Sequence, residues 1–288
     1  MTLPGPVSDG PSEPAARRLG RPDGLRDGWV PKLVALDLDG TVLRGDETLS
    51  DVVREAVGAA REAGAHVVVA TGRTVVGALD PARDLGLAGS LNVCSNGAVT
   101  AVLDPLDVVD MVTFDPAPVV RALRQELPDA LFAVEVLGTG HLVTGPFPEG
   151  ELTGAQTVVD LDELLANPAT RVVMRSPDRE PAHFLELVRR LGLEDVSYAV
   201  GYTAWLDVAP QGVSKASGLE GLARRLGVDP ADVLAVGDGR NDLEMLRWAG
   251  CGIAMGQAPA EVQDAADLVT GPVDEDGLAT ALSWFFDL

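Results

Sequence analysis

Short apolar runs alternate with amphipathic segments over most of this chain, and that alternation limits the fold more than any other feature. Four runs, at 33–39, 65–73, 233–239 and 251–256, are rich in Val, Ala and Leu and have the length of strands. Strands that are apolar on both faces are typical of parallel sheets with helices on either side. We therefore expect an α/β fold built on a doubly wound parallel sheet.

The segments between these runs have helical periodicity. In residues 50–64, Ser50 can cap the N-terminus of a helix and Gly64 can end it. Further helices are expected at 214–227 and 241–250. The first helix should place its apolar side chains on one face: Val52, Val53, Ala56, Val57 and Ala60.

The middle of the chain is less regular and indicates an inserted α+β cap. We expect a hairpin that turns at 138–140, one strand at 171–176, another at 197–209, and a helix at 181–192. The expected division is a catalytic core at 31–113 and 206–288, interrupted by an α/β cap domain at 114–205.

The first 30 residues differ from the rest in composition. They contain five Pro and five Gly and show little hydrophobic periodicity. A segment of this kind cannot bury enough apolar surface to fold by itself. We expect a disordered tail at 1–30, in which Trp29 could dock onto the folded body.

The balance of charge narrows the classes of function. The formal net charge is −22, whereas a nucleic-acid-binding protein would show a basic patch or stripe. The charge also disfavours an anionic membrane surface, and no run approaches the roughly 18 consecutive apolar residues of a membrane span. We expect small-molecule chemistry without nucleic acid or membrane partners, and any anionic substrate would need a locally positive site.

The two cysteines indicate a reducing compartment. Cys94 and Cys251 each lie in an apolar context, with neither the spacing of a metal site nor that of a disulfide framework. We expect buried thiols and a cytoplasmic protein.

Three of the expected strands end in polar groups. The first run ends in Asp37 and Asp39, and the second ends in residues 71–73. The third ends around Asp238, and Asp242 lies one turn into the next helix. The carboxyl ends of neighbouring parallel strands share one crevice. Several carboxylates there either take up protons or bind a cation, and an all-oxygen set suits Mg²⁺, which accepts one or two carboxylates and a substrate phosphate. A carboxylate that the metal does not hold can act as a nucleophile or as an acid and base.

Four short motifs occur in a fixed order along the chain: DLDGT at 37–41, ATGR at 70–73, Lys215 within GVSKASGL, and GDGRND at 237–242. Their order resembles that of the haloacid dehalogenase (HAD) superfamily of phosphohydrolases. The long interval between the second and third motifs is similar to that of the Cof-type subgroup, which carries a type IIB cap. The segments SNGA at 95–98, MGQA at 255–258 and DEDGLA at 274–279 resemble further features of the subgroup. The subgroup usually has Asn where this chain has Gln257, a position outside the expected catalytic set.

The resemblance implies the catalytic roles. Asp37 would be the nucleophile that forms an aspartyl-phosphate, and Asp39 the general acid and base. Thr71 would bind phosphate oxygens through its hydroxyl. Lys215 would neutralise the phosphoryl group and hold Asp37. Positioned cations matter because the transition state spreads charge over the phosphoryl oxygens.

The resemblance also implies a Mg²⁺ site and a set of substrate contacts. The metal would bind Asp37, Asp238, the backbone carbonyl of Asp39, and Asp242 directly or through a water. Gly40 would let the chain turn sharply beside it. The substrate-binding residues would be Gly40, Thr41, Gly72, Arg73, Asn96 and Asn241.

Several of these residues have a second interpretation. Arg73 could contact the substrate phosphate or pair with an acid. Asn96 could line the crevice or only form a hairpin turn. Asp242 could be an acid that stabilises a helix N-terminus. Among the three histidines, none of which has metal-ligand spacing, His141 is the one that could touch substrate.

The predicted function is Mg²⁺-dependent hydrolysis of a small phosphomonoester, plausibly a sugar phosphate. A phosphomutase on the same fold, or a non-catalytic regulator that binds a phosphorylated ligand, are the alternatives. A mutase would isomerise a sugar phosphate instead of releasing phosphate. A regulator would not need the complete set of Asp37, Asp39, Lys215 and Asp238.

Overall fold

The computed structural model describes residues 28–176, 196–200 and 205–287. Most of the expected tail and the helix expected at 181–192 therefore lie outside the described residues. Trp29 does dock onto the body: its indole N–H donates to the carbonyl of Ala231 (3.1 Å), and its ring meets Phe285 edge to face. Across the described residues, no helix combines the length and the apolar character that crossing a membrane demands.

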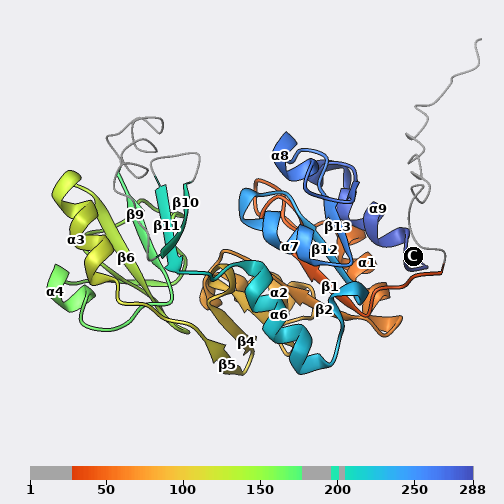
Figure 1. The fold of residues 1–288 in the computed structure, drawn as a ribbon, viewed down its shortest axis with the longest axis horizontal. Helices are drawn as coiled ribbons and strands as arrows, with labels where there is room; N and C mark the ends of the chain where they lie inside the picture. The colour runs from red at the N-terminus through yellow and green to blue at the C-terminus, as the bar shows by residue number, and fades with distance from the viewer. Residues whose placement is uncertain (1–27, 177–195, 201–204, 288) are drawn as a thin grey trace, which may run out of the picture.

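A five-stranded parallel sheet forms the centre of the larger unit (Figure 1). Its order is β14-β13-β12-β1-β2, and every pairing in it is parallel. These strands span Leu268–Val269, Cys251–Ala254, Val233–Gly237, Leu33–Leu36 and His66–Val69, respectively. The expected doubly wound α/β core is confirmed.

Helices cover this sheet on both faces, as the side chains of β1 require. Val34 and Leu36 point into one cluster with residues of α1 (Asp51–Glu62) and α9 (Gly277–Ser283). Leu33 and Ala35 alternate to the opposite face. There they pack with residues of α6 (Lys215–Leu226), α7 (Leu243–Trp248) and α8 (Ala260–Gln263).

The helix α1 largely confirms its sequence pattern. Ser50 caps it by accepting a hydrogen bond from the backbone N–H of Val53, and Gly64 follows it with a positive φ of 93°. Val53, Ala56, Val57 and Ala60 are buried, but Val52 is 54% exposed. The prediction for Val52 was wrong because the buried stripe begins one residue later, at Val53.

A smaller antiparallel sheet extends the core. Its order is β3-β4-β5, with strands at Leu91–Cys94, Val99–Leu103 and Leu106–Met111. A parallel bridge between Ala70 and Val93 joins it to the end of β2. The helix α2 (Val75–Asp84) packs in the same hydrophobic cluster as these strands.

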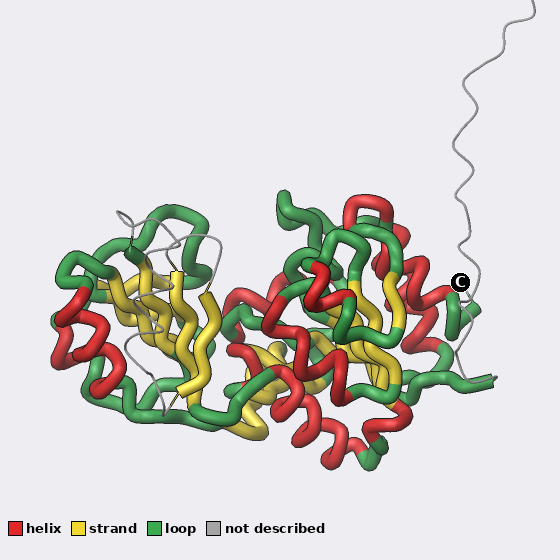
Figure 2. Tube along the Cα trace, turned by 45° about the horizontal axis from the view of Figure 1, so that its top comes forward, coloured by secondary structure: helices red, strands yellow, loops and turns green. Residues whose placement is uncertain are grey.

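A second unit, built on a six-stranded sheet, lies beside the core (Figures 1 and 2). Its order is β10-β11-β9-β6-β7-β8, and only β7 and β8 pair in parallel. The expected hairpin is β6 with β7. The single strand expected at 197–209 was wrong, because β10 and β11 share that stretch and pair antiparallel with each other. The strands span Val196–Val200, Trp205–Pro210, Val172–Arg175, Leu131–Val136, Gly140–Val143 and Ala155–Val158 in sheet order.

The two faces of the six-stranded sheet differ. Phe132 and Val134 pack on one face with residues of α3 (Ala117–Glu126) and α4 (Leu161–Leu164). Alternate residues point to the other face, where Glu135 and His141 lie opposite each other across β6 and β7. This face meets the core, because the Glu135 carboxylate accepts hydrogen bonds from the Val75 N–H (3.2 Å) and the Ser95 hydroxyl (2.5 Å).

Candidate active site

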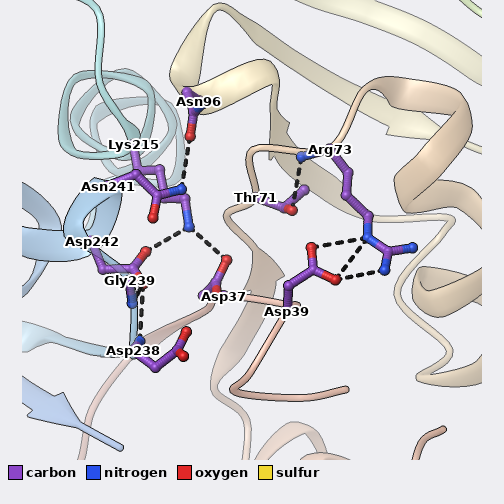
Figure 3. Close-up of polar contacts among 10 residues, drawn as sticks. All are labelled: Asp37, Asp39, Thr71, Arg73, Asn96, Lys215, Asp238, Gly239, Asn241 and Asp242. Atoms are coloured by element: carbon purple, nitrogen blue, oxygen red, sulfur yellow. Dashed lines mark hydrogen bonds and ion pairs between the residues drawn. The ribbon is translucent and has the colours of Figure 1, made fainter. Parts of the chain in front are cut away.

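The polar strand ends predicted from the sequence do converge (Figure 3). Asp37 and Asp39 follow β1, the segment 71–73 follows β2, and Asp238 follows β12. Lys215 is the first residue of α6, whose N-terminus Ser214 caps through a reciprocal pair of hydrogen bonds with Ser217. This N-cap determines where α6 begins and so places Lys215 beside the strand ends.

Lys215 is fully buried between two carboxylates. Its Nζ lies 2.5 Å from Asp37 Oδ1 and 2.5 Å from Asp242 Oδ1, and all three residues are buried. Burial opposes the charge of Lys215, but Asp242 and Asp37 outweigh it and raise the pKa of the ammonium. Burial, and then Asp242, raises the pKa of Asp37 well above its usual value, and Lys215 partly opposes that rise. The sequence thus placed these three residues together correctly.

Asp242 organises the loop that carries Asp238. One of its oxygens contacts Lys215, and the other accepts the backbone N–H groups of Asp238 (3.0 Å) and Gly239 (2.8 Å). Both oxygens are therefore engaged by donors of this chain. Asp242 is part of the site rather than only an acid at a helix N-terminus.

Asp238 lies half-buried against the turn at Gly40. A Cβ added at Gly40 would lie 2.3 Å from Asp238 Oδ2, and Gly40 has a φ of +82°, so glycine is needed here for both space and conformation. Burial, and then the charge of Asp242, raises the pKa of Asp238 to about 6. Gln257 donates to the Gly40 carbonyl (2.5 Å) and lies 3.4 Å from Asp238 Oδ2. Gln257, which the sequence analysis left out of the catalytic set, therefore contacts the turn that carries Gly40 and also Asp238.

Asp39 is paired with Arg73 across the mouth of the site. The guanidinium donates to both Asp39 oxygens, at 2.5–3.1 Å, and to Glu47 at 2.9 Å. The hydrogen bonding of the Arg73 guanidinium to Asp39 is the main reason that the pKa of Arg73 is raised. Of the two interpretations of Arg73, the structure displays the pairing with an acid. The Asp39 side chain remains 56% exposed.

The predicted phosphate-binding residues surround Asp37. Thr71 is buried, and its hydroxyl accepts the backbone N–H of Arg73 (3.0 Å), which orients residues 71–73. Thr41 is buried as well, and its hydroxyl has no hydrogen-bond partner among the described residues. Asn96 Oδ1 accepts from Asn241 Nδ2 (3.0 Å). Asn96 thus reaches the crevice although it also forms the turn between β3 and β4, within the short helix Ser95–Gly97.

A cavity of about 430 Å³ opens from these residues toward the six-stranded sheet. Asp37, Asp39, Gly72, Arg73, Asp238 and Asn241 line it on the core side. On the opposite side it is lined by Glu151, Thr153, His141, Arg171 and Trp205. Together these walls could enclose a small phosphorylated molecule.

The donor set fits a divalent cation. Asp37, Asp238 and Asp242 each offer a carboxylate oxygen, and these oxygens lie within 4.8 Å of one another. Lys215 supplies a single positive charge to the three acids, so the cluster has an excess of negative charge. A hard cation that prefers oxygen ligands would balance it.

Sequence reasoning missed Glu47, Glu151, Arg171 and Gln257. Each depends on pairings between segments far apart, such as Arg73 with Glu47. The sequence did carry a signal for the cap side of the site. Glu135 and His141 are polar residues in a hairpin whose strands are otherwise mostly apolar and buried.

Comparison with known proteins points to one family. The family described as haloacid dehalogenase-like hydrolase matches residues 34–124 and 148–282. The chain is 29% identical to the Bacillus subtilis 5-amino-6-(5-phospho-D-ribitylamino)uracil phosphatase YitU over 275 residues, covering 90% of this chain and 98% of YitU. It is 32% identical to the Natronomonas pharaonis phosphoglycolate phosphatase over 250 residues, covering 86% of this chain and 95% of that protein.

Two solved structures resemble it over nearly their whole length. One is a phosphatase of the haloalkanoate (HAD) enzyme superfamily from Bacteroides thetaiotaomicron, with a TM-score of 0.75 and 30% identity over 92% of this chain and 99% of that chain. The other is a sugar phosphatase of HAD subclass IIB, with a TM-score of 0.76 and 25% identity over 88% of this chain and 98% of that chain.

Proposed function

Because this chain belongs to the haloacid dehalogenase-like hydrolases and is a phosphatase, we propose that it hydrolyses a small phosphomonoester with Mg²⁺ through a phospho-aspartate at Asp37. One observation carries the proposal. The Asp37 carboxylate is held by the buried Lys215 within reach of Asp238, and it lines the cavity. A carboxylate fixed beside cationic charge is suited to attack phosphorus.

The first step joins Asp37 to the substrate. An Asp37 oxygen attacks phosphorus while the bond from phosphorus to the leaving oxygen breaks, and protonated Asp39 gives its proton to that oxygen. Arg73 aims the Asp39 carboxyl, since it contacts both oxygens. Thr71, Asn241 and the backbone of Gly72 bind the phosphoryl oxygens, and Lys215 offsets their charge.

The second step reverses the role of Asp39. Its carboxylate now takes a proton from water, whose oxygen attacks the phosphorus of the phospho-aspartate. Phosphate leaves, Asp37 is regenerated, and Asp39 is protonated again for the next cycle. Asp242 keeps Lys215 and the backbone of Asp238 in place throughout.

Asp37, Asp238 and the backbone carbonyl of Asp39 would hold the cation, with Asp242 behind them. When bound, Mg²⁺ would neutralise negative charge on the transferring phosphoryl group. The three-acid cluster and the raised pKa of Asp238 support this assignment.

We propose that the cap spans about residues 114–210. Phe114 pairs with Ala169 of the second unit, which supports the expected first boundary. The expected second boundary, at 205, falls where β11 begins, and β11 pairs within the six-stranded sheet as far as Pro210. The proposed tail stays at 1–30. Two free, buried thiols, Cys94 and Cys251, support a cytoplasmic location.

The test is release of phosphate from a panel of phosphorylated metabolites by the purified chain with Mg²⁺. The proposed function predicts turnover of small phosphomonoesters, its arrest by a chelator, and its absence in Asp37→Asn. Turnover that survives the chelator would refute the metal role, and an isomerised sugar phosphate without free phosphate would identify a mutase.

A further inference from the structure

His141 is a buried polar side chain whose two ring nitrogens find no hydrogen-bond partner of ordinary geometry among the described residues. It lies on β7, lines the cavity, and is only 3% exposed. Leaving a buried donor or acceptor unpaired costs about 1–3 kcal/mol, so such a group calls for an explanation. Its place in the wall of the cavity indicates that its partner is a ligand.

The surroundings of His141 favour the neutral imidazole. Burial, and then the positive charge of Arg171, lowers the pKa of His141 to about 4, against the opposing effect of a contact with the Thr153 backbone that falls short of ordinary hydrogen-bond geometry. A neutral imidazole has one N–H donor and one acceptor nitrogen. A hydroxyl group can pair with either nitrogen, because it both donates and accepts, whereas an anion can pair only with the N–H.

The cations of the cap wall are already paired with carboxylates. Arg171 contacts both oxygens of Asp207, at 2.5 and 2.6 Å, and Arg175 contacts both oxygens of Glu151 at 3.1 Å. Among the described residues, the cap wall of the cavity therefore presents no unpaired positive charge. A carboxylate or a second phosphate there would lose its hydration without gaining an unpaired cation in return.

Trp205 completes this wall. Its ring is fixed edge to face against Phe147, with centroids 6.2 Å apart, and it lines the same cavity. It adds apolar surface to the cap wall, and a charged group placed against this surface would gain no hydrogen bond or ion pair. The cavity of about 430 Å³ is larger than a phosphate alone needs, so a leaving group of several carbons can reach the cap wall.

We propose that His141 is a specificity-determining residue, which hydrogen-bonds a hydroxyl of the leaving group and selects neutral, hydroxyl-bearing phosphomonoesters against those with a second anionic group. The inference rests on the proposed phosphatase function. It adds which residue would recognise the part of the substrate that is remote from phosphorus.

A matched pair of substrates tests the inference. Glucitol 6-phosphate and 6-phosphogluconate differ only at the end remote from phosphorus, which is a hydroxymethyl group in the first and a carboxylate in the second. The wild-type enzyme should show a kcat/KM at least about tenfold higher for glucitol 6-phosphate, since an unpaired buried charge costs more than one lost hydrogen bond. Equal values, or a preference for 6-phosphogluconate, would overturn the proposal.

Variants then assign the effect to His141. In His141→Phe, the kcat/KM for glucitol 6-phosphate relative to that for para-nitrophenyl phosphate, which has no hydroxyl, should fall about three- to tenfold. His141→Gln, which keeps a donor and an acceptor, should recover part of the ratio. His66→Phe is the matched control and should leave the ratio unchanged. His66 is exposed at the N-terminal end of β2, whereas the site lies beyond the C-terminal end of that strand.

The outcomes separate the two proposals. If the wild-type chain with Mg²⁺ hydrolyses neither para-nitrophenyl phosphate nor the metabolites, the proposed function fails and this inference fails with it. If it hydrolyses para-nitrophenyl phosphate but the ratio is the same in His141→Phe as in the wild type, only the role of His141 is refuted. Should His141→Phe not fold, an unchanged ratio in His141→Ala would refute that role equally well.

Discussion

Lys215→Met should destabilise the protein far more than the loss of an ordinary lysine. The wild-type ammonium contacts Asp37 and Asp242 at 2.5 Å each, and none of the three side chains is appreciably exposed. Removing one partner of a buried ion pair leaves an uncompensated charge and costs about 3–5 kcal/mol. In a domain of this size that corresponds to a fall in Tm of roughly 10 °C.

The assay is chemical and thermal unfolding, followed by circular dichroism, of the metal-free protein and of the protein with Mg²⁺. Lys32→Met is the matched control, because Lys32 forms a single ion pair with Asp232 at 2.7 Å and its side chain is 68% exposed. Its loss should change the free energy of unfolding by less than about 1 kcal/mol. Mg²⁺ should restore part of the stability of Lys215→Met, because the cation replaces the missing positive charge.

The loss should also depend on pH, with a definite sign. Burial already raises the pKa of Asp37, and the variant lacks the ammonium that opposes this rise. A carboxyl group whose pKa is higher in the folded state favours folding when it is protonated. The deficit of Lys215→Met should therefore be largest above the folded-state pKa and shrink as the pH falls toward about 4, where the unfolded group also binds its proton. A deficit equal to that of Lys32→Met at every pH would refute the reasoning.

Three further predictions follow from the site. Asp39→Asn should lower kcat by about 10²–10⁴-fold through loss of the acid and base, yet keep the rise in Tm that Mg²⁺ produces in the wild type; loss of that rise would mean that the side chain itself binds the metal. The apparent affinity for Mg²⁺, measured by titration calorimetry, should weaken as the pH falls through about 6, because protons then compete for Asp238. An affinity that does not change from about pH 5 to 8, roughly the range in which such a group titrates, would count against Asp238 as a ligand. Gly40→Ala should abolish Mg²⁺ binding, because its Cβ would strike Asp238, whereas Gly58→Ala, in the open on α1, should bind Mg²⁺ as the wild type does.

The strand ends could be placed from the sequence because apolar runs and the parallel topology determine them. Once β1 and β12 lie side by side, Asp37 and Asp238 must share one edge of the sheet. The contact of Lys215 with Asp37 joins residues 178 positions apart. It was expected from the order of the motifs and not from any local pattern.

The mouth of the site could not be placed in the same way. Arg73 had two open interpretations, since a guanidinium binds phosphate and carboxylate alike, and the choice depends on where the loop at 44–48 brings Glu47. In the cap, the pairing of Arg171 with Asp207 depends on the register of β9 with β11. Such registers follow from the packing of the whole sheet rather than from either strand alone.

The most direct measurement is chemical identification of the phosphorylated residue during turnover. The enzyme would be mixed with substrate and Mg²⁺, quenched rapidly in acid, reduced with borohydride to mark any acyl phosphate, and digested for mass spectrometry. We predict a single modified aspartate at position 37 and no modification in Asp37→Asn. Two results would contradict the assignment of Asp37 as the nucleophile. One is rapid phosphate release with the modification on another residue. The other is rapid phosphate release with no modified residue in enzyme that is quenched at steady state with saturating substrate.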